Sequence, residues 1–128
     1  MRTVYTETVM DHFKNPRNIG IIEEPTAIIQ VGDPDCGDTL LLSLKIKKDK
    51  IVDIKYKIYG CAAAIATSSI ASEMAMGKTL NEALKIDEKA ITKALGGLPG
   101  EKNHCSNLAA GALRGAINEY RKSALKKA

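Results

Sequence analysis

Two segments of the chain alternate between apolar and polar residues, and a short polar stretch separates them. Residues 39–47 place on one face Leu40, Leu42, Leu44 and Ile46. Residues 51–59 place on one face Val52, Ile54, Tyr56 and Ile58, with charged residues opposite. A period of two is typical of β-strands with one buried face, and the Lys-Asp-Lys stretch at 48–50 predicts the hairpin turn between them.

Residues 27–32 predict a third, shorter strand, which would complete an antiparallel sheet with one covered face. Residues 3–14 predict a helix that ends before Pro16, because proline excludes the preceding residue from helical geometry. The apolar stripe of this helix would consist of Tyr5, Val9, Met10 and Phe13.

The period changes after Cys61, where residues 62–76 hold one charge and many small residues, which predicts a closely packed helix that ends at Gly77. Thr79 and Glu82 form a capping-box pattern, and Asp87 can cap a further short helix. The last helix is predicted at 105–125, with one face formed by Leu108, Ala112, Ala116, Ile117, Tyr120 and Ala124. We therefore expect one α+β domain over residues 1–128: a small antiparallel three-stranded sheet with helices packed on one face.

The balance of charged residues argues against one class of function, nucleic-acid binding. Nineteen basic and fifteen acidic residues give a net charge of +4, without the dense basic pattern of a nucleic-acid binder. Basic residues near the end of the last helix complement its dipole, and an acidic partner surface is the alternative. No apolar run reaches membrane-spanning length, and the first residues lack a signal-peptide core, so we expect a cytoplasmic protein without membrane or nucleic-acid partners.

The chain has three cysteines, each at a junction between predicted elements. A lone cysteine is most often a buried small apolar residue. Here Cys36 lies between acidic and glycine residues, a poor environment for a core side chain. Cys61 and Cys105 lie at predicted helix starts, where unpaired N–H groups and the helix dipole favour a thiolate. These positions favour metal binding or nucleophilic chemistry.

If the three thiolates converge, a four-coordinate centre lacks one ligand, and His104 and Asp38 are the candidates for it. Cys₃His is a known zinc set, and a [2Fe–2S] cluster also takes four ligands. A solvated loop histidine is the alternative for His104, and we expect His12 to be structural. Structural zinc sites use closely spaced cysteine pairs, whereas these cysteines are far apart, so we favour an exchangeable site.

Three motifs, PDCGD, YGCAAAIATSS and HCS, occur in the order typical of one family, after the N-terminal DHFKNPRN. With them the chain resembles, essentially end to end, the iron–sulfur cluster assembly scaffolds of the IscU / NifU N-terminal type. The resemblance implies a SufE/IscU-like fold and a scaffold or carrier protein rather than an enzyme.

By this resemblance, a cysteine desulfurase delivers sulfur, iron joins it, and a labile [2Fe–2S] cluster, in some cases [4Fe–4S], passes to acceptor apo-proteins. The resemblance makes Cys36, Cys61 and Cys105 the ligands, with Cys105 as the expected sulfur acceptor. Asp38 would ligate or tune lability, and His104 would be the alternate ligand. Zinc is expected to occupy the same site in purified protein, because thiolate-rich sites accept it readily.

The family's recognition loop for an Hsp70-type chaperone usually reads Leu-Pro-Pro-x-Lys. This chain keeps Leu98, Pro99 and Lys102 but has Gly100 at the second proline, which loosens the loop and leaves chaperone dependence open. Two other functions stay open as well: a zinc-stabilised interaction domain, and a sulfur carrier that depends on Cys105 alone. A second subunit is one source of a missing ligand, so a homo-oligomer is among the assemblies that the sequence allows.

Overall fold

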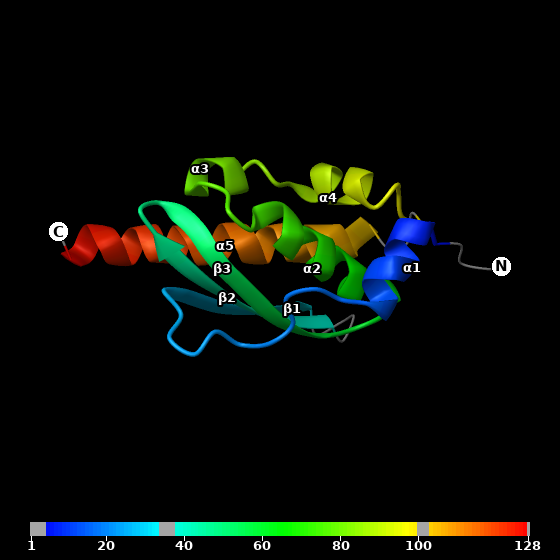
Figure 1. Cartoon of the computed structure of the whole chain (residues 1–128), viewed down its shortest axis with the longest axis horizontal. Helices are drawn as coiled ribbons and strands as arrows, with labels where there is room; N and C mark the ends of the chain where they lie inside the picture. Colours follow the sequence, from blue (N-terminus) through cyan, green and yellow to red (C-terminus); the bar gives the residue numbers. More distant parts are fainter. Residues whose placement is uncertain (1–4, 34–37, 100–102, 128) are drawn as a thin grey trace.

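The computed structural model describes residues 5–33, 38–99 and 103–127. The strands form one antiparallel sheet in the order β1-β2-β3, and Figure 1 shows the helices arranged around it. The elements in chain order are α1 (Glu7–Lys14), β1 (Ala27–Asp33), β2 (Asp38–Lys47), β3 (Lys50–Tyr59), α2 (Ala62–Ala75), α3 (Leu80–Ala83), α4 (Glu88–Ala94) and α5 (Asn103–Lys127).

The hairpin between β2 and β3 is confirmed, and its turn is the tightest that a hairpin allows. Lys47 pairs with Lys50, so only Lys48 and Asp49 lie in the loop. Both have positive φ, 51° and 60°, as a two-residue turn of type I′ requires. This turn matches the right-handed twist of the strands and so fixes the register of the two long strands.

A β-bulge changes the predicted inward face of β3. Lys45 pairs with Asp53, but Ile46 pairs with Ile51, so β3 contains one extra residue at this point. As a result Ile51 is fully buried, whereas Val52 is 46% exposed. The prediction that Val52 belongs to the buried face was therefore wrong, because an extra residue reverses the alternation beyond it. Ile54 and Tyr56 are buried as predicted.

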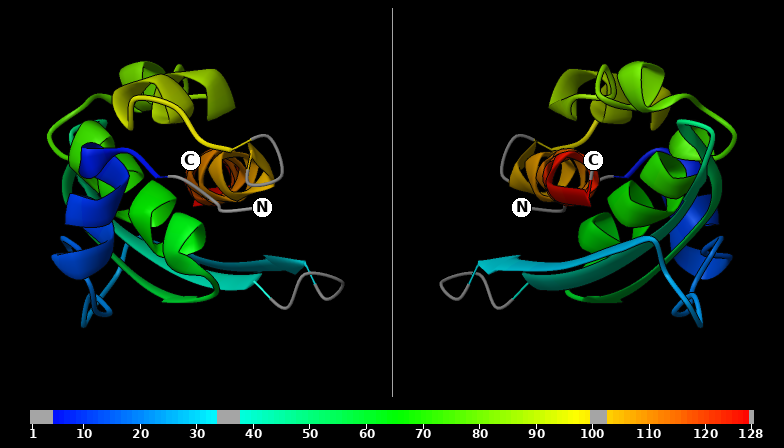
Figure 2. Two further views of the ribbon diagram at one scale, coloured as in Figure 1. Left: turned by 90° about the vertical axis from the view of Figure 1, so that its right-hand side faces the viewer. Right: turned by 90° about the vertical axis from the view of Figure 1, so that its left-hand side faces the viewer.

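The helices α2 and α5 cover one face of the sheet, as Figure 2 shows from two sides. The inward side chains of β2 are all buried. Ile29 of β1 reaches α5, where its Cδ1 would lie only 2.7 Å from a Cβ on Gly115. The largest fully buried side chains include Tyr56, Leu40, Leu44, Ile51, Ile54, Leu80, Ile91, Leu95, Leu113 and Ile117. The predicted architecture, helices on one face of a three-stranded sheet, is confirmed.

The helix α2 packs closely because its buried positions are all small. They are Ala63, Ala64, Ala66, Thr67, Ser68, Ser69, Ala71, Ser72 and Ala75. The helix ends before Gly77, which has a φ of 79°, a conformation that favours glycine after a helix end. The predicted capping box of Thr79 and Glu82 and the Asp87 cap of α4 are both present.

The helix α1 packs through part of its predicted apolar stripe and also through polar side chains that contact α2. Val9 is buried, but Phe13 is exposed and His12 is buried instead. His12 Nδ1 lies 2.7 Å from Ser69 Oγ, and its Nε2 lies 3.3 Å from Glu73 Oε1. Ser69 Oγ also accepts the backbone N–H of Arg17 at 3.0 Å. We call His12, Arg17, Ser69 and Glu73 the His12 cluster.

The His12 cluster has a definite pattern of hydrogen bonds. Since Glu73 can accept the Nε2–H, the Ser69 hydroxyl is left to donate to Nδ1, which makes His12 a neutral imidazole in this assignment. Burial lowers the pKa of His12, and the positive charge of Arg17 acts in the same direction. His12 is therefore a structural residue, in agreement with the sequence-based prediction.

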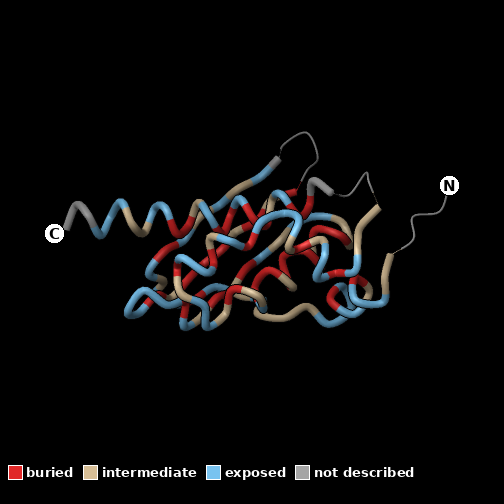
Figure 3. Tube along the Cα trace, turned by 90° about the horizontal axis from the view of Figure 1, so that it is seen from above, coloured by how far each residue is buried: buried red, intermediate tan, exposed pale blue. Residues whose placement is uncertain are grey.

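The helix α5 begins at Asn103, two residues before the predicted start, and runs beyond the body of the molecule. Ala112, Ala116 and Ile117 are buried as predicted, but Ala124 is exposed. Figure 3 shows why: the C-terminal turns of α5 project past the other elements. In the described ranges, no helix combines the length and the apolar character that crossing a membrane requires.

Candidate functional site

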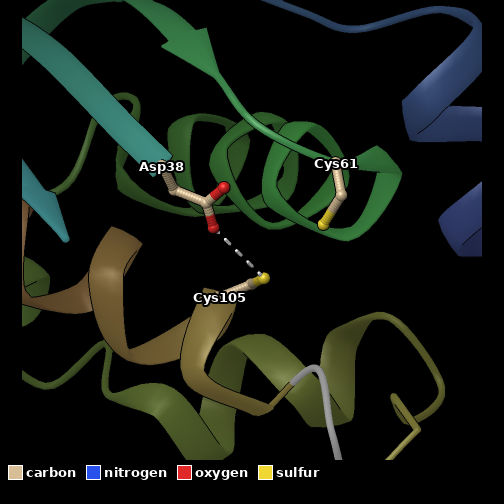
Figure 4. A group of neighbouring side chains, drawn as sticks. All are labelled: Asp38, Cys61 and Cys105. Carbon is tan, nitrogen blue, oxygen red and sulfur yellow. Dashed lines mark hydrogen bonds between the residues drawn. The ribbon is translucent and has the colours of Figure 1, made fainter. Parts of the chain in front are cut away.

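Asp38, Cys61 and Cys105 meet at one end of the sheet, although each comes from a different element. Their ligand atoms, one carboxylate oxygen and two Sγ atoms, all lie within 4.8 Å of one another. Figure 4 shows the three side chains pointing toward a common centre. We call these three residues the ligand group. Two of the three predicted cysteines and the predicted carboxylate are thus brought together.

Asp38 is the first residue of β2 and is only 5% exposed. It lies opposite the segment that leads from β3 into α2, and its Oδ1 lies close to the backbone of Gly60. Its other oxygen, Oδ2, lies 3.9 Å from Cys105 Sγ, and the thiol donates to it. The carboxylate is thus held between two segments that are far apart in the sequence.

Cys61 occupies the N-cap position of α2 with extended backbone geometry (φ −78°, ψ 177°). Its side chain makes no capping hydrogen bond, and the first turn of α2 has no acidic residue. The Cys61 sulfur is therefore not used to cap the N–H groups of its own helix. Cys61 is also partly exposed, which gives solvent and partners access to it.

Cys105 lies in the first turn of α5 and is only 1% exposed. It packs with Ala63 and Ala64 of α2, and Tyr5 and Leu98 pack against the same small cluster. One side of Cys105 thus resembles the environment of an ordinary buried cysteine. The other side faces Asp38 and Cys61, so the residue also meets the geometric requirement for a ligand.

The donor set suits a cation that accepts both sulfur and oxygen. Thiolates bind zinc and iron, and a carboxylate is an accepted ligand of both, whereas magnesium and calcium prefer oxygen alone. Three groups that can all be anionic are costly to hold together, and a cation between them compensates the repulsion. The group therefore fits a thiophilic metal ion or a metal cluster.

Comparison with known proteins agrees with this site. The sequence matches the family described as NifU-like N terminal domain over residues 4–127. The chain belongs to this family. It is 57% identical over 117 residues to the iron-sulfur cluster assembly scaffold protein IscU 1 of Archaeoglobus fulgidus, and the match covers 91% of this chain and 76% of that protein. It is 45% identical over 118 residues to IscU of Aquifex aeolicus, with 91% and 75% covered.

A solved structure supports the same membership. The crystal structure of a putative iron-sulfur cluster assembly scaffold protein for the SUF system from Fervidobacterium islandicum has a TM-score of 0.72 to this chain. The two are 27% identical, and the match covers 88% of this chain and 96% of the other. The NifU-like fold expected from the sequence motifs is therefore confirmed at the level of both sequence and structure.

Several residues that the family resemblance assigns lie outside what the structure describes. Cys36 and Lys102 are outside the described residues, and so is the side chain of His104, whose backbone belongs to α5. Leu98 and Pro99 are described and partly buried, and Leu98 packs against the cluster around Cys105. The ligand roles of Cys36 and His104 stay predictions, and so do the partner-recognition roles of Leu98, Pro99 and Lys102.

In this NifU-like chain some residues shape the site without binding anything, and they were not predicted from the sequence. Ala63 and Ala64 let α5 approach α2 closely enough for Cys105 to reach the ligand group. Gly60 leaves room for the Asp38 carboxylate. A signal was present, because a glycine and three alanines flank Cys61 where a helix start could hold larger residues.

Proposed function

We propose that this protein is a scaffold on which an iron–sulfur cluster is assembled and from which it is passed to apo-proteins. The observation that carries the proposal is the ligand group: two cysteines and an aspartate from separate elements, with ligand atoms within 4.8 Å of one another. Membership of the NifU-like family and the scaffold names of its close relatives support it. The protein acts as a carrier, not as a catalyst.

The spacing of the ligand group suggests how loading begins. A single tetrahedral ion with a metal–sulfur bond of about 2.3 Å and a metal–oxygen bond of about 2.0 Å holds a sulfur and an oxygen ligand about 3.5 Å apart. The separation of 3.9 Å between Cys105 Sγ and Asp38 Oδ2 is a few tenths of an ångström longer than this value. The described arrangement therefore suits one iron or zinc ion, and a [2Fe–2S] cluster requires the ligands to spread. Ligands on three separate elements can do so without unfolding any of them.

The full ligand set of the proposal includes two further residues. Cys36, two positions before Asp38 in the sequence, would add a third thiolate, and His104, next to Cys105, would be the alternate ligand. A carboxylate among thiolates offers iron a weaker and more exchangeable bond. Such a mixed set suits a cluster that is released rather than retained.

The proposal requires a sulfur donor and a cluster acceptor as partners. The sulfur donor would be a cysteine desulfurase, and its sulfur would pass to Cys105. Because Cys105 is buried, sulfur transfer to it requires a local opening, whereas Cys61 is partly exposed. Leu98 packs against the cluster around Cys105, so a partner that binds Leu98 would act close to the site.

Anaerobic assembly followed by transfer tests the proposal. The protein is incubated with a cysteine desulfurase, cysteine and ferrous iron, then separated and mixed with an apo-ferredoxin. We expect an oxygen-sensitive visible chromophore that appears on the protein and then moves to the ferredoxin. Assembly on the protein without any transfer to the acceptor would rule out the scaffold function.

The competing proposal is an interaction domain that zinc stabilises, and the mononuclear spacing of the ligand group favours it as an alternative. The main core of this chain, however, lies between α2, α5 and the sheet, and its large side chains form a cluster separate from the small one that contains Cys105. Removal of zinc with a chelator should therefore leave the cooperative unfolding transition in place. Loss of that transition on chelation would favour the zinc domain instead.

A further inference from the structure

Gly60 lies between the end of β3 and the N-cap of α2, in direct contact with the carboxylate of Asp38. Its φ is not among the positive values of this chain, so the backbone conformation alone does not require glycine there. An alanine could adopt the same backbone. The reason for glycine must therefore be sought in the space around it.

That space is occupied on two sides. A Cβ on Gly60 would lie 2.6 Å from Asp38 Oδ1, 3.0 Å from Asp38 Cγ and 2.8 Å from Ala64 Cβ. The shorter two of these separations lie below the distances that real Cβ atoms show, so one of the neighbours would have to move. Gly60 itself is exposed, and the crowding comes from the site, not from the core.

The contact with Gly60 assigns different surroundings to the two oxygens of Asp38. Oδ1 lies against the backbone of Gly60, and Oδ2 faces the thiol of Cys105. A side chain at position 60 would rotate the carboxylate away from this orientation, because the end of the Asp38 side chain moves more easily than a helix. If Ala64 moved instead, Cys61 at the start of the same helix would be displaced.

We propose that Gly60 is a positioning residue of the ligand group, which keeps the Asp38 carboxylate directed at the metal. The inference rests on the proposed function only for its biological purpose, because the positioning can be measured with a metal ion alone. It makes residue 60 a determinant of ligand identity: with a side chain there, the aspartate would no longer take part, and the donor set would lose its oxygen.

Cobalt(II) binding to the metal-free protein tests this inference, because cobalt occupies zinc-type sites and reports its ligands in the visible spectrum. We expect Gly60→Ala to lower cobalt affinity by about 10- to 100-fold, the range found when a residue that orients a ligand is changed. The spectrum should come to match that of Asp38→Ala while its sulfur charge-transfer bands persist. Gly111→Ala, on α5 with open space around the new Cβ, should leave affinity and spectrum unchanged.

A double-mutant cycle separates positioning from a general structural effect. In the wild type, Asp38→Ala should lower cobalt affinity substantially, whereas in the Gly60→Ala background the same change should have little further effect. Full additivity of the two substitutions would overturn the inference, as would wild-type affinity in Gly60→Ala.

A second variant covers the case in which Gly60→Ala does not fold. Gly60→Ala combined with Ala64→Gly removes the contact with α2 and keeps the contact with Asp38. It should fold and show the same loss of cobalt affinity, and normal affinity in this variant would overturn the inference. Cobalt binding does not involve the desulfurase or the acceptor. A failure of cluster transfer in the wild type, with these cobalt results intact, would therefore count against the scaffold function alone.

Discussion

The helix α2 contributes to two clusters of polar side chains, the ligand group at its N-terminal end and the His12 cluster toward its C-terminal end. The two clusters differ in how their charges are compensated. Toward the C-terminal end of α2, the His12 cluster joins Ser69 to His12 at 2.7 Å and to the backbone N–H of Arg17 at 3.0 Å, and it joins His12 to Glu73 at 3.3 Å. At its N-terminal end, the ligand group gathers two thiols and a carboxylate, whose charges have the same sign when all three are ionised.

The difference shows how to distinguish a structural polar cluster from a binding site. A complementary network satisfies buried groups and fixes the position of α1 on α2. In the ligand group the Cys105 thiol donates to Asp38, but ionisation of the thiols would bring like charges together, and a cation would compensate them. Both clusters contain residues that occur in metal sites, so residue type alone does not separate them. The predictions below test whether stability and metal binding are as separate as this comparison requires.

The largest effect should follow from Cys61→Ala. Because the proposed ligand set includes the Cys61 sulfur, we expect the variant to lose nearly all cluster after anaerobic assembly, measured by visible absorption and iron content. Its unfolding temperature without metal should stay close to that of the wild type. Ser106→Ala, next to Cys105 but bonded to Thr92 at 2.8 Å, is the matched control and should retain its cluster. Equal cluster content in Cys61→Ala and wild type would remove Cys61 from the ligand group.

Asp38→Ala should slow the release of the cluster, because the carboxylate would be the exchangeable oxygen ligand of the proposed set. We expect transfer to an apo-ferredoxin to be slower by about tenfold, which corresponds to about 1.4 kcal/mol of barrier. Asp53→Ala serves as the control, since Asp53 accepts the N–H of Ile54 on β3 instead of joining the ligand group. Equal or faster transfer by the Asp38 variant would contradict this role.

Ser69→Ala should affect stability and not metal binding. It leaves His12 and the N–H of Arg17 without their common partner, and an unsatisfied buried group costs about 1–3 kcal/mol of the free energy of unfolding. Ser68→Ala is the matched control, since Ser68 bonds only to the carbonyl of Ala64 in its own helix and should cost less. Chemical denaturation of the metal-free protein measures both. A clear loss of cobalt affinity in Ser69→Ala would contradict the prediction that the His12 cluster does not affect metal binding.

The smallest effect should be a dependence of stability on pH. The pKa of His12 is lower in the folded protein than its ordinary value of 6.5, so the unfolded chain takes up the proton first. The contribution of neutral His12 is fully present above pH 6.5 and is lost as the pH falls toward the folded pKa. Burial is the main cause, Arg17 adds to it, and Glu73 and Asp11 oppose it. Denaturation curves between pH 7 and pH 5 should show a smaller decline for His12→Gln, and identical slopes would argue against this origin.

The sequence predicted the fold well where a local pattern determines it. The alternation in residues 39–47, the turn at Lys48 and Asp49, and the capping box of Thr79 and Glu82 are all present. The prediction failed where contacts between distant segments decide which side chains are buried. The bulge that exposes Val52 has no local signal in the alternation of residues 51–59. The burial of His12 in place of Phe13 depends on Ser69, which lies 57 residues further along the chain.

The site was predictable as chemistry but not as geometry. The positions of Cys61 and Cys105 at helix starts indicated two ligands, and Asp38 was a candidate for the ligand that three thiolates leave missing. The spacing of the three, the burial of Cys105 and the role of Gly60 depend on how closely α5 and β2 approach α2. Such distances follow from packing across the fold, which no pattern along the chain records.

The order of the elements has a consequence for the time at which the protein becomes competent. Synthesis proceeds from the N-terminus, so Asp38 and Cys61 leave the ribosome well before Cys105, which lies on the last helix. A nascent chain that ends before α5 lacks a ligand and also the helix that closes the core over the sheet. Metal uptake at the described group therefore waits until translation has passed α5, and a ribosome stalled earlier presents a chain that cannot sequester iron there.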